Sequence, residues 1–414
     1  MRWVGPKKFY SPADPDSRRN ARIVEPYPDF KRCGASERWR FEATWLTFEV
    51  RHYIFVLSKF IIKLTEMTIS RRALLTWSSL GSSVAAALFS GRRLSGQTAP
   101  DASHGTAHRM HAMGPVGRVT SQWFDPGAFL RTWNFSNLPA NERSRHYRET
   151  RRPDGSYLRE YEIAAVDREI EIAPGVFFPA WTYNGQVPGP TLRATEGDRV
   201  RVTFINQGSH PHSIHFHGWH PPEMDGSFPA QQVKPGDRFV YEFDADPFGL
   251  HLYHCHTLPL KRHIHKGLYG VFIVDPKTPR APADELVMVL NGFDTNFDVD
   301  NEVYAVNSIA NHYMHEPIRV DVGRLVRMYV VNVTEFDLIN SLHLHGMFFD
   351  VNRTGTATTA SERTDTIMLS QGERAILETR FRYPGRFMFH AHQSEFAELG
   401  WMGAFEAAES NDVG

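Results

Sequence analysis

The feature that most constrains the fold is an internal duplication. Residues 234–256 align without a gap with residues 370–392, and each copy places one glycine 18 residues and another five residues before a histidine, His254 or His390. The matched pairs are Gly236/Gly372, Arg238/Arg374, Glu242/Glu378 and Gly249/Gly385. Earlier in each copy, a run that starts at a glycine, 197–206 or 323–332, leads to a His-x-His-Gly tetrapeptide. A repeat of this kind predicts two copies of one structural domain.

The secondary structure predicted for each copy is almost entirely β. Short runs such as 169–172, 199–205 and 238–243 alternate polar with β-branched or aromatic residues and are separated by Gly and Pro. Helical periodicity is nearly absent from the copies, which argues against an α/β fold. We therefore expect an all-β chain with two sandwich domains, at 166–277 and 283–408, joined by the proline-rich segment 276–282.

The chemistry of the chain is indicated by its histidines, which form four His-x-His pairs, two in each copy. Side chains at positions i and i+2 of a strand point to the same face, so each pair presents two imidazoles together. Eight imidazoles suffice for three copper ions, since copper accepts imidazole in both of its oxidation states. The pairs are His215/His217, His254/His256, His343/His345 and His390/His392.

A further copper site is predicted around Cys255, which stands between two of these histidines. A thiolate with two imidazoles and a weak axial neighbour is the ligand set of a blue-copper electron-transfer site. His212 and His263 are the expected imidazoles, and His265 is the competitor of His263. Leu268, five residues after His263, takes the axial position and cannot coordinate, which predicts a three-coordinate copper of comparatively high potential.

These motifs together resemble those of the multicopper oxidases, over about 169–405. The resemblance implies two tandem cupredoxin-like Greek-key β-sandwiches and four copper ions per functional unit: one type 1, one type 2 and two type 3. It places the type 1 copper on His212, Cys255 and His263, with Leu268 as the axial non-ligand. It places the type 2 copper on His215 and His343, and the type 3 pair on His217, His254, His256, His345, His390 and His392.

The second copy departs from the larger three-domain members of that family. Asn340 stands where a type 1 histidine would be, and Ala391 stands where the cysteine would be. The chain therefore resembles the two-domain, laccase-like subgroup with its type 1 copper in domain 1. In that subgroup the cluster forms between subunits of a head-to-tail trimer, so the resemblance implies a homotrimer.

Two carboxylates are expected to take part in catalysis, because reduction of dioxygen to water consumes protons. Glu395 follows His392 by three residues and matches an acid near the last cluster motif of laccase-like enzymes. Asp225 matches another family acid near the type 2 copper.

The resemblance implies an enzyme that couples one-electron oxidation of a small phenolic or aromatic-amine donor to four-electron reduction of dioxygen. Such oxidation requires only an exposed edge of a type 1 histidine. A protein donor that docks on Lys261, Arg262 and Lys266 is an alternative. The competing functions are a copper-containing nitrite reductase, which needs a single type 2 copper and no ligand at His256, and a non-catalytic copper-binding protein.

Charge and cysteine content exclude some partners. The chain has 46 basic and 47 acidic residues and no long block of one sign, so we expect no nucleic-acid partner. Its cysteines, Cys33 and Cys255, are too few for a disulfide framework.

The N-terminal part carries a twin-arginine motif, Arg71-Arg72, followed by a short apolar run. Residues 67–98 thus resemble a twin-arginine export signal, which predicts a periplasmic or secreted protein without a membrane span in its mature form. We expect residues 1–66 to be a mis-annotated upstream segment, with Met67 the true start, and 99–165 to be a linker and N-terminal extension. His104, His108, Met110, His111 and Met113 fall in this linker, where they either capture copper or have no ligand role.

Overall fold

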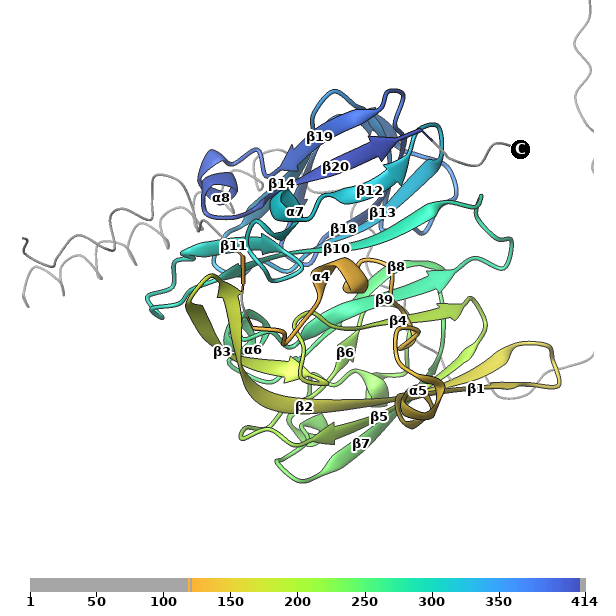
Figure 1. Cartoon of the computed structure of the whole chain (residues 1–414). Helices are drawn as coiled ribbons and strands as arrows, with labels where there is room; N and C mark the ends of the chain where they lie inside the picture. The colour runs from red at the N-terminus through yellow and green to blue at the C-terminus, as the bar shows by residue number, and fades with distance from the viewer. Residues whose placement is uncertain (1–117, 120, 410–414) are drawn as a thin grey trace, which may run out of the picture. The chain divides into compact units, whose positions relative to one another are not determined.

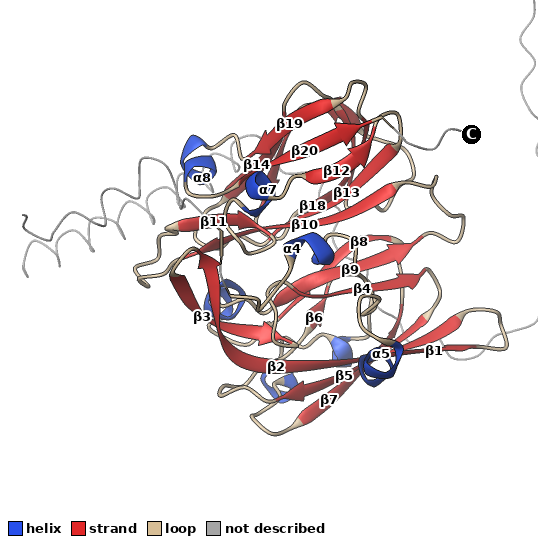
Figure 2. Cartoon of the chain, in the orientation of Figure 1, coloured by secondary structure: helices blue, strands red, loops and turns tan. Residues whose placement is uncertain are grey.

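The computed structural model describes residues 118–119 and 121–409. The predictions for 1–66, for the export signal at 67–98 and for the histidines and methionines between His104 and Met113 fall outside these residues. No helix within the described residues has both the length and the apolar character needed to cross a membrane. The described chain contains strands and a few short helices (Figures 1 and 2).

The first sandwich consists of a five-stranded and a four-stranded sheet. The larger sheet has the order β1-β2-β5-β7, with β3 also paired to β2, and the smaller has the order β4-β9-β8-β6. The strands of the larger sheet are β1 (Tyr147–Arg151), β2 (Tyr157–Ala173), β3 (Val176–Tyr183), β5 (Arg199–Asn206) and β7 (Arg238–Asp244). Those of the smaller are β4 (Gly189–Thr195), β6 (His215–Phe216), β8 (Gly249–His254) and β9 (Tyr269–Asp275).

The second sandwich consists of a six-stranded and a five-stranded sheet. Their orders are β11-β10-β13-β18-β15-β16 and β12-β20-β19-β14-β17. The first of these contains β10 (Asp284–Phe293), β11 (Val303–Val306), β13 (Leu325–Asn332), β15 (Phe349–Arg353), β16 (Glu362–Thr364) and β18 (Arg374–Arg380). The second contains β12 (Ile318–Asp321), β14 (Ile339–Leu344), β17 (Thr366–Ser370), β19 (Gly385–His390) and β20 (Met402–Ala408).

The duplication seen in the sequence reappears in the strand pairing. β2 pairs parallel with β5, which pairs antiparallel with β7, and β10, β13 and β18 repeat this arrangement. Likewise, β4 pairs parallel with β9, and β12 pairs parallel with β20. The prediction of an all-β fold with two tandem sandwiches is confirmed.

Alternation of side chains explains the first core. In β5, Val200, Val202 and Phe204 are fully buried while the residues between them are partly exposed. Strands β8 and β9 are buried on both faces, because a separate apolar cluster lies between the two sandwiches. In that cluster Leu250 and Val271 pack with Val287 and Val331. An ion-pair network joins the domains as well, since Arg193 contacts both Asp275 and Glu285 at 2.7 Å.

The start of the first sandwich differs from the expectation. The expected boundary at residue 166 falls inside β2, which begins at Tyr157, and residues that we assigned to a linker form α4 (Pro126–Phe129), α5 (Ala140–His146) and β1. The first part of β2 pairs with β5 from Leu158 to Ala165. Several charged residues interrupt this stretch, so the apolar alternation that marks a strand is weak there.

Candidate metal centre

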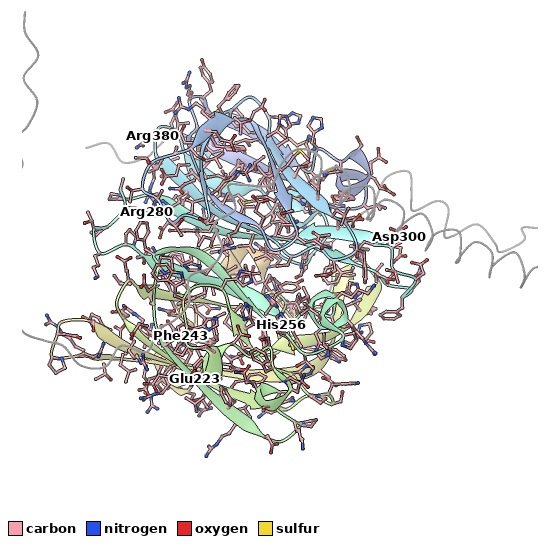
Figure 3. The ribbon with its side chains drawn as sticks, turned by 180° about the vertical axis from the view of Figure 1, so that it is seen from behind. Glu223, Phe243, His256, Arg280, Asp300 and Arg380 are labelled. Carbon is pink, nitrogen blue, oxygen red and sulfur yellow. The ribbon has the colours of Figure 1, made fainter. Side chains whose placement is uncertain are left out.

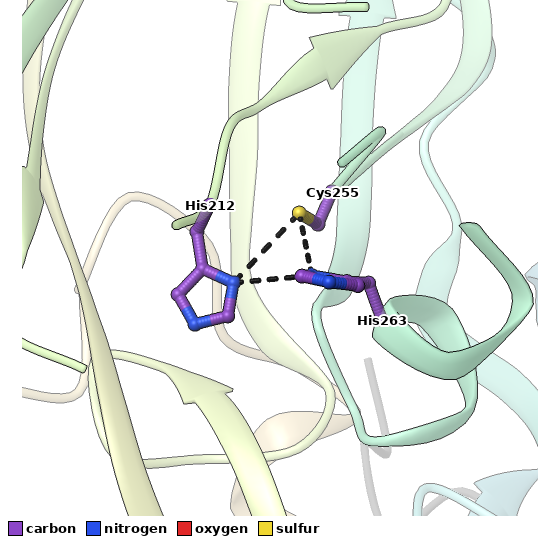
Figure 4. Close-up of side chains that lie close together, drawn as sticks. All are labelled: His212, Cys255 and His263. Carbon is purple, nitrogen blue, oxygen red and sulfur yellow. Dashed lines mark hydrogen bonds between the residues drawn. The ribbon is translucent and has the colours of Figure 1, made fainter. Parts of the chain in front are cut away.

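Cys255, His212 and His263 converge inside the first sandwich although they come from three separate segments (Figure 4). His212 lies after β5, where its backbone pairs with Val233, Cys255 directly follows β8, and His263 lies in α6 (Leu260–His265). The two Nδ1 atoms are 3.2 Å apart, and the Cys255 Sγ lies 3.3 Å from His263 Nδ1 and 4.0 Å from His212 Nδ1. Three donor atoms thus face one point.

The protonation of this trio fits a metal site. Burial lowers the pKa of His212 to about 3 and that of His263 to about 4, so both imidazoles remain neutral and keep a lone pair for a metal. Burial raises the pKa of the Cys255 thiol, while hydrogen bonds from Thr257 and Ser213 lower it. Binding of a metal would displace the proton of this thiol, and the resulting thiolate with two neutral imidazoles is the donor set that suits blue copper.

The neighbouring residues of α6 discriminate between the two histidines proposed for this site. His265 accepts a hydrogen bond from the backbone N–H of Asp294 (2.9 Å) and lies against the ring of Phe178, so its side chain is engaged elsewhere. His263 is the one beside Cys255. Leu268 is fully buried, and its carbonyl oxygen accepts a hydrogen bond from the N–H of Cys255 (3.0 Å).

Of the two histidines beside Cys255, His212 is fully buried and His263 keeps a small exposed fraction. His212 is 0% exposed and His263 is 3% exposed. Lys266, one of the three residues considered for docking of a protein donor, is not available at the surface. It is buried, and its ammonium lies over the rings of Phe178 and Phe297, at 4.9 and 4.8 Å. Burial lowers the pKa of Lys266 to about 8.

Near α6, Glu335 is a half-buried carboxyl whose pKa burial raises to about 7, against the opposing effect of Lys261. Its folded pKa exceeds the unfolded value of about 4.3, so ionisation favours the unfolded chain. The free energy of unfolding should therefore fall as pH rises from about 4 to about 7. The free energy of unfolding of Glu335→Gln should lack this decline. The stability of the variant relative to the wild type should therefore be greater at pH 8 than at pH 5.

Denaturant titrations of the copper-free proteins at pH 5 and pH 8 measure this effect. Glu406→Gln, at an exposed carboxylate, is the control. An equal stability difference between wild type and Glu335→Gln at both pH values contradicts the prediction.

The first quartet, which we define as His215, His217, His254 and His256, lies where β6 and β8 end. The strands pair with His215 opposite His254. The Nε2 atoms of His217 and His254 are 3.2 Å apart, and the ring centroids of His215 and His256 are 5.4 Å apart. Burial lowers the pKa of His217 to about 2 and that of His254 to about 4, so these imidazoles are neutral.

The second quartet, which we define as His343, His345, His390 and His392, repeats this arrangement on β14 and β19. Here His343 lies opposite His390. The Nε2 atoms of His345 and His390 are 2.8 Å apart, and the ring centroids of His343 and His392 are 5.4 Å apart. His345 and His392 are exposed, so one side of this quartet is open.

Equivalent backbone oxygens orient the rings in both quartets. His215 Nδ1 donates to the carbonyl of Asp225 and His343 Nδ1 to that of Asp365, both at 2.9 Å, which leaves each Nε2 free for a metal. In the first quartet a sharp turn sets this geometry. Gly226, next to Asp225, has φ +75°, and a Cβ there would lie 2.1 Å from the carbonyl oxygen of Ile214.

Two serines that the sequence analysis missed complete the symmetry. The Oγ of Ser213 accepts a hydrogen bond from the N–H of His256 (3.2 Å), and that of Ser341 accepts from the N–H of His392 (2.7 Å). Both serines occupy the same position in the two copies, one residue after His212 or Asn340. Extending the repeat alignment to these motifs could have found them.

The cluster of His212, Cys255 and His263 has no counterpart in the second sandwich as far as the structure describes it. Asn340, at the position of His212, donates a hydrogen bond to Thr334 Oγ1 (2.9 Å), and Ala391, at the position of Cys255, is fully buried. Buried neutral contacts thus replace the ligands there.

The two quartets remain separate within one chain. Figure 3 shows His256 on the first sandwich and Arg380 on the second. For the residues that the structure describes, no group of side chains able to hold a metal combines histidines of both quartets, and no ring contact or hydrogen bond joins the quartets.

The two predicted carboxylates lie in different surroundings. The Oδ1 of Asp225 is 3.2 Å from His215 Nδ1 and 3.8 Å from His220 Nε2, so this carboxylate borders the first quartet. Glu395 is exposed in the first turn of α8 (Ser394–Glu398), three residues after His392. No contact of its side chain with a histidine is seen within the described chain.

Two sandwiches that each carry a histidine quartet, with a buried cluster of His212, Cys255 and His263 in the first, define a two-domain copper-binding β protein. Two models of the multicopper oxidase family match the chain, over residues 166–279 and 279–411. A crystal structure of a multicopper oxidase is 54% identical, with a TM-score of 0.66, over 69% of this chain and 98% of that one. The chain belongs to the multicopper oxidase family.

Relatives with different activities share parts of the chain. A copper-containing nitrite reductase from Neisseria gonorrhoeae is 30% identical over 254 residues, which are 56% of this chain and 63% of the relative. Laccase 1 from Metarhizium acridum (strain CQMa 102) is 41% identical over 102 residues, which are 23% of this chain and 16% of the relative. The chain therefore spans less than two thirds of the length of either protein.

Proposed function

We propose that the protein is a laccase-like oxidase that couples one-electron oxidation of a small phenolic or aromatic-amine donor to four-electron reduction of dioxygen to water. The observation that carries this proposal is the pair of equivalent imidazole quartets. A trinuclear cluster needs both quartets, whereas a single type 2 copper needs far fewer imidazoles.

The ligands follow the assignment by resemblance. His212, Cys255 and His263 would hold a type 1 copper, and the quartets would hold one type 2 and two type 3 ions. When bound, these ions supply one-electron storage and the reduction of dioxygen. The chain supplies the connection, because His254, Cys255 and His256 are consecutive and so link the type 1 site to the cluster through covalent bonds.

The separation of the quartets supports a cluster shared between chains. On its exposed side the second quartet leaves room for metal ligands from another subunit. We infer a homotrimer in which the first quartet of one subunit meets the second quartet of the next, as a head-to-tail ring requires. We also infer export through the twin-arginine route to the periplasm or the medium.

Nitrite reduction is the second candidate function, favoured by the relative from Neisseria gonorrhoeae. Oxygen uptake with a phenolic donor and nitrite consumption without oxygen, measured on the same copper-loaded sample, separate the two. Turnover of nitrite with no uptake of oxygen would overturn the oxidase. Copper content without either turnover would indicate a binding protein.

The carboxylates are proposed as proton donors to the cluster. Asp225→Asn or Glu395→Gln should slow reoxidation of the fully reduced protein by dioxygen by ~100-fold or more, the usual effect of losing a general acid. The visible absorption of the type 1 site should persist, because neither carboxylate contacts it. Stopped-flow mixing of reduced protein with oxygenated buffer measures the rate.

Asp365→Asn is the matched control for Asp225→Asn. The Oδ1 of Asp365 lies 3.9 Å from His343 Nδ1 in the second quartet, whereas the Oδ1 of Asp225 lies 3.2 Å from the Nδ1 of the equivalent histidine in the first. We expect a smaller effect from it. Reoxidation at the wild-type rate in Asp225→Asn and Glu395→Gln would remove both carboxylates from the mechanism.

A further inference from the structure

Ser213 lies between the two places where copper is proposed to bind in the first sandwich. It directly follows His212 in the sequence and is fully buried. We propose that Ser213 is a positioning residue for electron transfer from the type 1 site to the cluster, because it holds Cys255 and His256 in one orientation. This inference rests on the proposed oxidase function.

One side of Ser213 contacts the sulfur of the type 1 trio. Its backbone N–H donates a hydrogen bond to the Cys255 Sγ over 3.4 Å. Burial raises the pKa of the Cys255 thiol, and hydrogen bonds from Thr257 and from both the N–H and the side chain of Ser213 oppose this rise. Hydrogen bonds to the sulfur are among the factors that set the potential of a blue-copper site. Ser213 is therefore placed to tune this sulfur.

The other side of Ser213 contacts the first quartet. The Ser213 Oγ accepts a hydrogen bond from the backbone N–H of His256 (3.2 Å). This N–H belongs to the peptide bond between Cys255 and His256, and the ring of His256 lies 5.4 Å from that of His215. One serine therefore fixes the peptide that joins the sulfur-bearing residue to a quartet histidine.

Two buried tyrosines hold the backbone of Ser213 in place. The hydroxyl of Tyr183 donates to the carbonyl oxygen of Ser213 (2.7 Å), and the N–H of Ile214 donates to the hydroxyl oxygen of Tyr241 (2.9 Å). Both tyrosines are fully buried and belong to the core of the first sandwich. The peptide that follows Ser213 is thus anchored through both of its polar groups.

The second copy offers an internal comparison. Ser341 occupies the same position, and its Oγ accepts a hydrogen bond from the N–H of His392 (2.7 Å). Ala391 stands where the first copy has its cysteine, and the Ser341 hydroxyl donates to the Oε1 of Gln393. Both serines thus hold the backbone of a quartet histidine. As far as the structure describes the chain, Ser213 alone also lies beside a cysteine.

The step that Ser213 supports moves one electron and no proton. The electron that reduces Cu(II) to Cu(I) at the type 1 site passes on to the cluster, which restores Cu(II), and no bond of the protein forms or breaks. The path runs through the peptide between Cys255 and His256. Without the Ser213 Oγ, the N–H of His256 loses its acceptor, which is costly for a buried group, so this peptide should reorient.

The test follows this electron in the copper-loaded protein without oxygen. A pulse of reducing radicals bleaches the visible absorption of the type 1 site, and the absorption returns as the electron moves to the cluster. In Ser213→Ala we expect the return to be ~10-fold or more slower than in the wild type, as for other residues that orient metal ligands. Ser341→Ala, the matched control, should slow the return far less, because it leaves the peptide before His256 untouched.

The reduction potential of the type 1 site gives a readout that a purely structural role would not change. Loss of the Ser213 hydroxyl removes one hydrogen bond to the sulfur, which favours Cu(II) over Cu(I). The potential should therefore fall in Ser213→Ala and stay at the wild-type value in Ser341→Ala. Redox titration of the visible absorption measures it.

Hydrogen exchange tests the contacts themselves in the copper-free protein. The amide of His256 should exchange faster in Ser213→Ala, and that of His392 should exchange faster in Ser341→Ala. Mass spectrometry of the peptides that contain these residues measures the exchange. Wild-type exchange at His256 in Ser213→Ala would contradict the contact on which the proposal depends.

The proposal fails if the absorption returns at the wild-type rate in Ser213→Ala. It also fails if Ser341→Ala slows the return equally, since the effect would then come from the quartets alone. Should Ser213→Ala not fold, Tyr183→Phe removes the anchor of the Ser213 carbonyl and should slow the return too, and a wild-type rate there would overturn the proposal. A wild-type protein in which the absorption never returns would instead refute the oxidase function itself.

Discussion

Replacing Cys255 with serine is expected to abolish both the visible absorption and the oxygen uptake of the copper-loaded protein. The thiolate is the one soft donor of the buried trio, and serine keeps its size but cannot form the copper–sulfur bond that gives the absorption. Oxygen uptake with a phenolic donor should fall at least ~100-fold, the upper end of the losses seen for residues that merely support metal ligands.

His256→Ala is the matched variant for this experiment, since it lies next to Cys255 but points into the first quartet. It should keep the visible absorption and lose oxygen uptake. Copper content, visible and paramagnetic spectra and oxygen uptake are measured on each protein. Retention of the absorption in Cys255→Ser would contradict the type 1 assignment. Loss of the absorption in His256→Ala would mean that the type 1 site needs His256, which would contradict its assignment to the first quartet.

Mixing two inactive variants should restore activity if the cluster forms between chains. His217→Ala breaks the first quartet and His345→Ala breaks the second, so each protein alone should be inactive. In a ring of randomly mixed chains, an interface is intact when it joins an unbroken first quartet to an unbroken second quartet. Each condition holds half the time, so about a quarter of the interfaces should be active.

The control for chain exchange is an equal mixture of wild type with the double variant His217→Ala/His345→Ala. Its activity should fall from half to about a quarter of the wild-type value if chains exchange and share clusters. If exchange is shown by mass measurement and the two single variants still do not complement each other, the cluster is not shared between chains. The trimer proposed here would then be wrong.

Much of the fold could be predicted from the sequence because repetition and alternation are local signals. The copies at 234–256 and 370–392 share glycines and charged residues at matched positions, and the structure repeats the pairing of the strands common to both sandwiches. The grouping of His-x-His pairs likewise follows from strand geometry. The start of the first domain was harder to predict, since charged residues interrupt the early part of β2.

Contacts between distant segments could not be predicted in the same way. Trp181 lies 31 residues before His212 in the sequence, and no spacing rule connects a tryptophan of β3 with a histidine after β5. The two rings nevertheless lie 5.2 Å apart in the structure. The carbonyl groups of Asp225 and Asp365 act through backbone geometry, which leaves no residue-specific signal.

The apolar cluster between the two sandwiches has a consequence for assembly. Because Leu250 and Val271 pack against Val287 and Val331, the domains cannot hinge without exposing these side chains to water. The two sandwiches then move as one rigid body that carries two different interfaces, one at each histidine quartet. The angle between those interfaces would set the number of subunits in a closed ring.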